Sequence, residues 1–181
     1  MTKPSILVVG SSNTDMIIKV QRIPQPGETI LGGEFALAAG GKGANQAVGA
    51  ARAGGAVTFI ARLGRDMFGD QALAGFVADG INVKHVVRDP AAPSGVALIF
   101  VARNGENSIA VASGANARLA PADLQRAQAA FRRAAAFRRA AALRYAAAFR
   151  RFAPQAEEAA ELLLALARDQ FHDFDAVRHR S

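Results

Sequence analysis

Short apolar runs alternate with glycine-rich turns along the first two thirds of the chain, a pattern typical of buried strands in an α/β protein. Ile6–Val9 ends in Gly-Ser-Ser-Asn and predicts a strand that feeds a turn. A run of small residues over 44–53, closed by two glycines, predicts a helix. Residues 96–102 and 108–112 flank an Asn-Gly pair, which predicts a hairpin. Further strands are expected over 17–20, 29–35 and 57–61.

Turn and cap signals add two more helices to this pattern. Gly64–Asp70 opens one of them, with its aspartates as candidate N-caps, and we expect Asp66 to have a structural role. His85 follows a Gly-Ile-Asn turn and is expected to be a solvated strand residue. Pro121 and Asp123 stand where the last helix of this part would begin.

The densest glycine cluster lies just before the first expected helix. Gly40, Gly41 and Gly43 surround Lys42, and Asn45 follows. Glycine permits positive φ and a close approach of a ligand to the main chain, and a helix start directs backbone N–H groups at that ligand. The stretch is not a phosphate-binding P-loop, because no Ser or Thr follows the lysine. The alternative interpretation is a tight strand-to-helix turn with a surface lysine.

Two polar residues, Asn13 and Asp15, follow the first strand. Ligands of open α/β sheets gather at the carboxyl ends of the strands, so both residues are well placed to meet one. A carboxylate accepts hydrogen bonds from hydroxyls, whereas an amide both donates and accepts, and this combination suits a polyol. The alternative is that the two residues only shape the turn.

Several motifs occur together in a recognisable order and spacing. They are Gly10-Ser11-Ser12-Asn13-Thr14-Asp15, Pro26-Gly27-Glu28-Thr29 and Gly41-Lys42-Gly43-Ala44-Asn45-Gln46-Ala47, followed by Gly54, Gly64, Asp66, Phe68 and Gly69. From about Ile6 to about Leu124 the chain resembles the ribokinase/PfkB family of carbohydrate kinases.

The resemblance implies an α/β fold: a partial three-layer ribokinase-like sheet with a small β lid, followed by a mostly α-helical tail outside the family pattern. The expected division is residues 1–125 for the sugar-binding side and lid, and 126–181 for the tail. The lid would also offer a homodimer contact.

By the same resemblance, the family's activity is the ATP-dependent phosphorylation of D-ribose, or a similar sugar, at its 5-hydroxyl. The residues that match the family's sugar-binding positions are Asn13, Asp15, Gly41, Lys42 and Asn45. Gly41 would contact the sugar through its backbone, and Lys42 and Asn45 would bond hydroxyls. ATP and Mg²⁺ are the expected cofactors.

In the family, the catalytic aspartate belongs to a later Gly-Ala-Gly-Asp motif, and the nucleotide site lies in the same second half of the protein. All 17 glycines of this chain lie at or before Gly114, so that motif is absent. We therefore expect no catalytic residue and no nucleotide site in this chain, and little activity from it alone. A truncated or frameshifted fragment that binds sugar or dimerises is the alternative.

Charge separates the tail from the rest. Eight arginines and no acidic residue lie between Arg126 and Ala153, and without them 14 of the 22 basic residues remain against 15 acidic ones. The Phe/Arg/Ala pattern that begins at Phe131 repeats every six residues, so on a helix its large residues point in three directions and form no apolar stripe. Spaced arginines and aromatics suit nucleic acid or another anionic surface. Binding of nucleic acid or an anionic surface by the tail is the less favoured alternative, because the arginines do not share one face of the expected helix.

Composition excludes some classes of protein. Cysteine is absent, which excludes disulfides and thiolate metal sites, and no metal site is expected. No apolar run is long enough for a membrane span, and the N-terminus lacks the layout of a signal peptide. The cytoplasm is the expected compartment.

Overall fold

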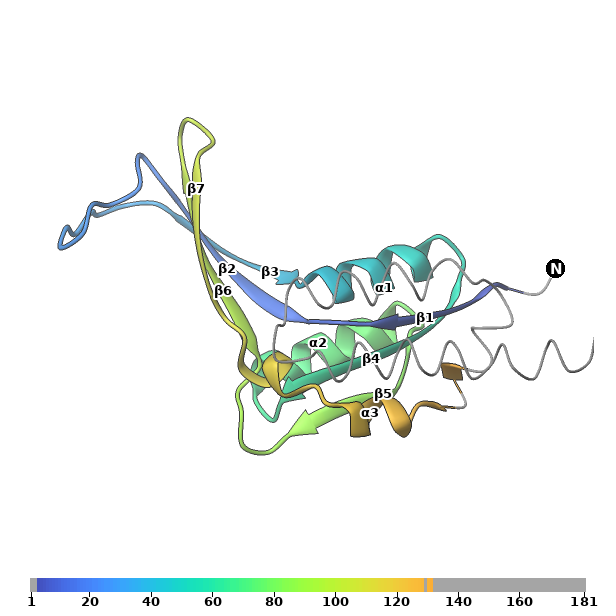
Figure 1. Ribbon diagram of the computed structural model, residues 1–181. Coiled ribbons are helices and arrows are strands. Elements are labelled where there is room, and N and C mark those ends of the chain that lie inside the picture. The colour runs from blue at the N-terminus through green and yellow to red at the C-terminus, as the bar shows by residue number, and fades with distance from the viewer. Residues whose placement is uncertain (1–2, 129, 132–181) are drawn as a thin grey trace, which may run out of the picture.

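The computed structural model describes residues 3–128, 130 and 131. Within them the chain forms two sheets that meet at their bases (Figure 1). One is a three-stranded sheet covered by helices, which we name the core sheet. The other is a four-stranded sheet that extends away from the helices, which we name the lid sheet.

The core sheet consists of parallel strands in the order β1-β4-β5. The strands are β1 (Ser5–Val9), β4 (Ala56–Gly64) and β5 (Asn82–Asp89). Helix α1 (Lys42–Arg52) leads into β4, and α2 (Met67–Ala78) connects β4 to β5. Parallel neighbours require such crossover connections, so the α/β class expected from the sequence is confirmed.

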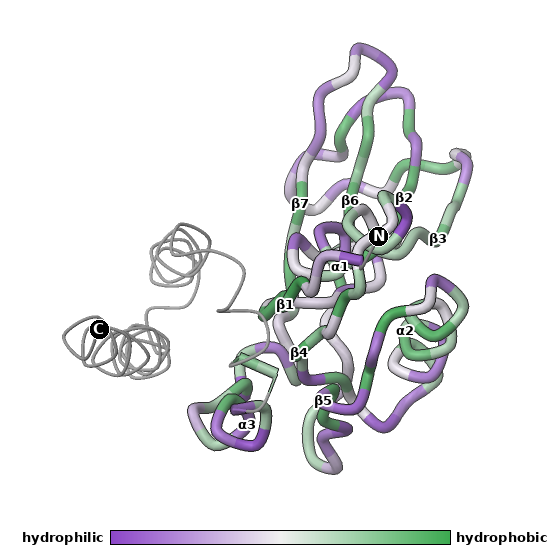
Figure 2. Tube along the Cα trace, turned by 90° about the vertical axis from the view of Figure 1, so that its right-hand side faces the viewer, coloured by the Kyte–Doolittle hydropathy of each residue, from purple (hydrophilic) through white to green (hydrophobic). Residues whose placement is uncertain are grey.

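Helices cover both faces of the core sheet because β4 is apolar on both sides. Phe59 and Ile60 are each 0% exposed, and successive strand residues point to opposite faces. Phe59 packs with α1 and α2 and meets Phe76 edge-on, with ring centroids 5.1 Å apart. Ile60 packs with Leu124 of α3 (Pro121–Gln125) on the other face. Figure 2 shows α2 and α3 on opposite sides of β4 and β5.

The lid sheet has the order β3-β2-β6-β7. Strands β2 and β6 run parallel, and the two outer pairs are antiparallel. Its strands are β2 (Asn13–Val20), β3 (Glu34–Gly40), β6 (Gly95–Ala102) and β7 (Asn107–Ala112). A 3-10 turn over Gly114–Arg118 returns the chain from β7 to the core.

Two strand predictions for the lid sheet were inaccurate. The strand expected over 17–20 begins four residues earlier, because it pairs along its whole length with β3 and β6. The strand expected over 29–35 was wrong, and β3 instead begins at Glu34. Gly32 and Gly33 have φ angles of 89° and 125°, which keep residues just before Glu34 out of extended strand geometry.

Most other predictions of local structure are confirmed. The helix predicted from small residues is α1, and the Asn-Gly hairpin joins β6 to β7. Asp66 is the N-cap of α2, accepting the N–H of Gly69 at 2.8 Å, and its carboxylate also accepts from Ser94. His85 lies on strand β5, as predicted, and is half-buried. Burial and nearby Lys84 lower the pKa of its imidazole.

Nearly all of the tail, residues 132–181, lies outside the described residues, and so does the predicted six-residue repeat after Phe131.

Candidate functional site

The core sheet and the lid sheet join where β1 ends and α1 begins. Asn13, the first residue of β2, pairs with Gly40, the last residue of β3, and with Gly95, the first of β6. The N–H of Ala44 in the first turn of α1 donates to the carbonyl of Ser11 at 3.0 Å. Three segments that are distant in the sequence, 11–13, 40–44 and the start of β6, therefore meet at the base of the lid sheet.

Two glycines at the start of α1 make this junction possible. Gly41 has a φ of 94°, and a Cβ atom on it would lie 2.7 Å from both the Ser11 carbonyl oxygen and the Cα of Ser12. A Cβ on Gly43 would lie 2.7 Å from the backbone of Gly10. Real Cβ atoms do not approach backbone so closely, so the start of α1 rests directly on the turn between β1 and β2.

Asp15 occupies space that another glycine leaves open. A Cβ atom added at Gly40 would overlap the Asp15 carboxylate. Burial raises the pKa of this carboxyl group. Among the described residues, no side chain or backbone group donates a hydrogen bond to the carboxylate and no cation pairs with it. Its oxygens can therefore accept hydrogen bonds from a ligand.

Asn13 is held by a residue that the sequence analysis did not single out. Asn116 donates from Nδ2 to Asn13 Oδ1 at 2.8 Å. Asn116 is itself anchored on Ser12, accepting the backbone N–H at 2.9 Å and donating to the backbone carbonyl at 3.0 Å. The only sequence signal was the Ser-Gly-Ala-Asn turn after the hairpin, whose role is visible only when residues about 100 positions apart are brought together.

The other predicted site residues lie on the first turn of α1. Lys42 is the first residue of the helix and Asn45 the fourth, and both are exposed. The N–H of Asn45 donates to the Gly41 carbonyl at 2.9 Å, which continues the helical turn. The structure thus brings Asn13, Asp15 and Gly41 together at the junction, with Lys42 and Asn45 beside them.

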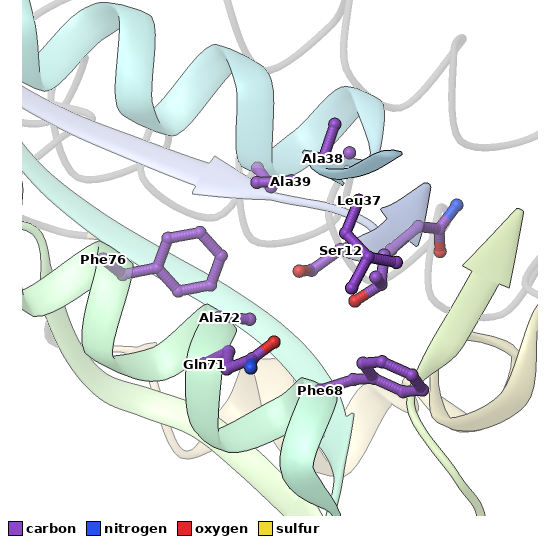
Figure 3. A pocket seen from close by; sticks show the side chains of 12 residues that line it. Ser12, Leu37, Ala38, Ala39, Phe68, Gln71, Ala72 and Phe76 are labelled. Atoms are coloured by element: carbon purple, nitrogen blue, oxygen red, sulfur yellow. The ribbon is translucent and has the colours of Figure 1, made fainter. Parts of the chain in front are cut away.

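A hollow of about 180 Å³ lies next to the junction, between α2 and β3 (Figure 3). Phe68, Gln71 and Phe76 of α2 line one side of it, and Leu37 of β3 lines the other. Asn13 is the only predicted site residue among those that line it. Sequence reasoning gave no indication of this hollow, because Phe68 was noted only as part of the family motif and Gln71 had no chemical signature.

Metal ions and phosphate groups find no recognisable binding motif among the described residues. No group of three or more His, Asp or Glu side chains within residues 3–128, 130 and 131 could hold one. The Gly-rich start of α1 is not a phosphate-binding P-loop either, since Gly43, not Ser or Thr, follows Lys42. Within the described residues, Mg²⁺ and ATP are therefore assigned no binding residues. No helix of this part is long and apolar enough to cross a membrane.

The fold and the junction together define an α/β protein with a polar cluster suited to a hydroxyl-bearing ligand at the carboxyl end of a parallel sheet. A family model described as pfkB family carbohydrate kinase matches residues 3–177. The chain belongs to the PfkB family of carbohydrate kinases.

Curated relatives agree with this assignment. The chain is 42% identical over 122 residues to the deoxyribokinase of Salmonella typhi, covering 67% of this chain and 40% of that protein. It is 41% identical over 127 residues to the ribokinase of Haemophilus influenzae, covering 70% and 42% respectively. The chain thus spans about two fifths of the length of the curated relatives it matches.

Solved structures show the same ribokinase-like fold. Ribokinase from Giardia lamblia superposes with a TM-score of 0.66 at 35% identity, covering 72% of this chain and 39% of that one. Arabidopsis thaliana ribokinase, solved with ribose and ATP, gives a TM-score of 0.63 at 33% identity, covering 74% and 44%. The predicted ribokinase-like architecture is confirmed for the described residues.

The family match also bears on the expected boundary at residue 125. It runs past that position to residue 177, into the segment where the sequence analysis expected no family pattern. The division into 1–125 and 126–181 stays a prediction.

Proposed function

We propose that this chain carries the sugar-binding part of a ribokinase-type kinase and that its ligand is D-ribose. The observation that carries the proposal is the Asp15 carboxylate at the junction. It accepts no hydrogen bond from the described residues. Half-buried acceptors of this kind need a partner, and sugar hydroxyls supply one. The similarity to ribokinases and to a deoxyribokinase supports the same class of substrate.

In this proposal the five junction residues act together on hydroxyl groups. Asp15 accepts from one hydroxyl, and Asn13 bonds a hydroxyl through its amide. Gly41 lets the sugar approach the backbone, because no Cβ stands in the way. Lys42 and Asn45 add donors from the first turn of α1, and the amino end of that helix favours electron-rich groups.

The proposed reaction of the whole kinase is transfer of the ATP phosphoryl group to the 5-hydroxyl of D-ribose. ATP, with Mg²⁺, would supply the phosphoryl group and neutralise its charge. The described residues contribute sugar binding and orientation to this reaction, and none of them is assigned as the catalytic base. We therefore expect the chain alone to bind D-ribose and to phosphorylate it poorly.

The partner we propose for the lid sheet is a second copy of this chain. Two rows of apolar side chains cross one face of the sheet in register, Phe35–Ile18–Phe100 and Leu37–Met16–Leu98. Phe35 is 66% exposed and Leu98 is 51% exposed. Sedimentation would show a dimer that Leu98→Glu dissociates, and a monomer at all concentrations would exclude this partner.

A thermal melt with and without millimolar D-ribose tests the proposed function. A ligand that binds only the folded state raises the midpoint, and the stabilisation grows with the logarithm of the ligand concentration over Kd. We expect an upward shift for the unchanged chain and none for Asp15→Asn. A cooperative melt without any shift in the unchanged chain would contradict the proposal. A coupled assay for ADP release in the same samples measures how much phosphorylation accompanies binding.

A further inference from the structure

We infer that Asn116 is a positioning residue that fixes the orientation of the Asn13 amide, so that its NH₂ group is the end left to donate to the ligand. The inference rests on the proposed function, because it specifies how the same junction recognises a hydroxyl. It concerns a residue on the 3-10 turn Gly114–Arg118, outside the five predicted site residues.

The orientation of the Asn116 amide follows from its backbone partners. The backbone N–H of Ser12 can only donate, so the atom that receives it at 2.9 Å is the Asn116 oxygen. The Ser12 carbonyl can only accept, so the atom that approaches it at 3.0 Å is the Asn116 nitrogen. These two bonds fix the amide, because turning it over would place two donors and two acceptors against each other.

The same nitrogen then determines the orientation of Asn13. Asn116 Nδ2 lies 2.8 Å from the Asn13 side chain, and a donor in that position requires an acceptor, Oδ1. The Asn13 NH₂ group must therefore point elsewhere. Within the described residues it makes no hydrogen bond.

A glycine opposite Asn13 leaves room for this amide pair. Gly95 pairs with Asn13 between β2 and β6 and is buried. A Cβ atom there would overlap both Asn116 Nδ2 and Asn13 Oδ1. The lack of a side chain at Gly95 therefore leaves room for the hydrogen bond between Asn116 and Asn13.

The result is a donor and an acceptor side by side on one strand. Asn13 and Asp15 are two residues apart on β2 and therefore lie on the same face. Asn13 offers a donor, and Asp15 offers an acceptor. A hydroxyl group satisfies both, whereas an ammonium group cannot accept from Asn13 and a phosphate or carboxylate is repelled by Asp15. The junction is therefore built for a neutral polyol.

The test uses the full chain with ¹⁵N-labelled asparagine side chains, read by NMR. The Asn13 NH₂ signal is identified by its loss in Asn13→Asp. Asn116→Asp replaces the donor with an acceptor, so we expect the Asn13 signal to move in the ligand-free protein. Asn104→Asp is the matched control, because it makes the same chemical change on the exposed β6–β7 turn. An Asn13 signal that stays at the same position in Asn116→Asp would overturn the positioning role.

The second arm adds D-ribose. In the unchanged chain we expect the Asn13 NH₂ signal to shift as the sugar binds, which a purely structural amide pair would not produce. We expect Asn116→Asp and Gly95→Ala to weaken D-ribose binding about 10- to 100-fold, the loss of roughly one hydrogen bond with its partner left unpaired. Asn104→Asp should bind normally.

The outcomes separate this inference from the proposed function. The inference is overturned if D-ribose binds to the unchanged chain without moving the Asn13 signal. It is also overturned if a folded Asn116→Asp variant binds D-ribose with full affinity. Either result leaves the proposed function standing. No D-ribose binding by the unchanged chain overturns the proposed function and the ligand half of the inference, while the ligand-free arm still decides the positioning half. Should Asn116→Asp or Gly95→Ala fail to fold, the shift that D-ribose causes in the unchanged chain still tests the inference, because it uses neither variant.

Discussion

The core sheet and the lid sheet contain similar apolar residues, yet they bury them very differently. In the core sheet, Phe59 and Ile60 of β4 are completely covered by helices from both sides. In the lid sheet, Leu37, Leu98 and Ile109 are half exposed or more. The core sheet buries its apolar residues beneath its own helices, whereas the lid sheet leaves an apolar face exposed, which the proposed second copy would cover. We therefore expect substitutions in the core sheet to act mainly on stability and those at the base of the lid sheet to act mainly on binding.

The largest expected effect comes from breaking the core. Phe59→Ala removes a ring that packs between α1 and α2 and should lower the free energy of unfolding by about 3–5 kcal/mol. Phe35→Ala, on the exposed face of the lid sheet, should change it by about 0.5 kcal/mol or less. Urea unfolding of both variants measures the difference. Equal losses would show that the lid sheet is as well packed as the core.

The next effect concerns the junction between the two regions. Gly41→Ala forces a side chain into positive φ and against the Ser12 backbone, so we expect a loss of about 2–4 kcal/mol. D-ribose affinity should fall with it, since the β1–β2 turn must move. Urea unfolding and titration with D-ribose measure the two losses. A Gly41→Ala variant with unchanged stability would mean that α1 does not rest on this turn.

Asp15→Asn should separate stability from binding. Burial raises the pKa of Asp15, so its ionised form opposes folding at neutral pH, and the variant should melt at the same or a higher temperature. The difference in melting temperature between Asp15→Asn and the unchanged chain should shrink as pH falls through the raised pKa. It should vanish below the pKa of an ordinary aspartate, where the carboxyl group is neutral in both the folded and the unfolded chain. D-ribose affinity should be lost in the variant.

The pH dependence of binding gives the complementary result for the unchanged chain. D-ribose affinity should fall on acidification at a pH above the ordinary aspartate range, because a protonated Asp15 is a poorer acceptor. Titrations of D-ribose over a pH series measure this midpoint. Affinity that stays constant through the acid range would remove Asp15 from the site.

The smallest effect is a control on the glycine argument. Gly49 lies in the exposed part of α1, and a Cβ there would meet nothing within 4 Å. Gly49→Ala should therefore raise stability by about 0.5–1 kcal/mol, opposite in sign to Gly41→Ala. The same urea titration measures this gain. Destabilisation by Gly49→Ala would show that the free space around a glycine does not predict the effect of replacing it.

The comparison also explains what sequence reasoning could and could not reach. Elements with local signals were predictable, such as the Asp66 cap of α2 and the Asn-Gly hairpin. The start of β3 was not, because positive φ at Gly33 is a property of the folded loop and not of residue type alone. Asn116 was missed for a related reason, since its meaning depends on pairing with Ser12 and Asn13 across the fold.

The most direct test of the account is amide hydrogen exchange of the full chain with and without D-ribose. The sugar is proposed to bind at the junction, so backbone amides over 10–15 and 40–45 should become protected, while those of β5 should not change. Protection in these two segments, lost in Asp15→Asn, is the predicted result. Protection confined to other segments, or no protection at saturating D-ribose, would contradict the claim that the sugar binds at the junction.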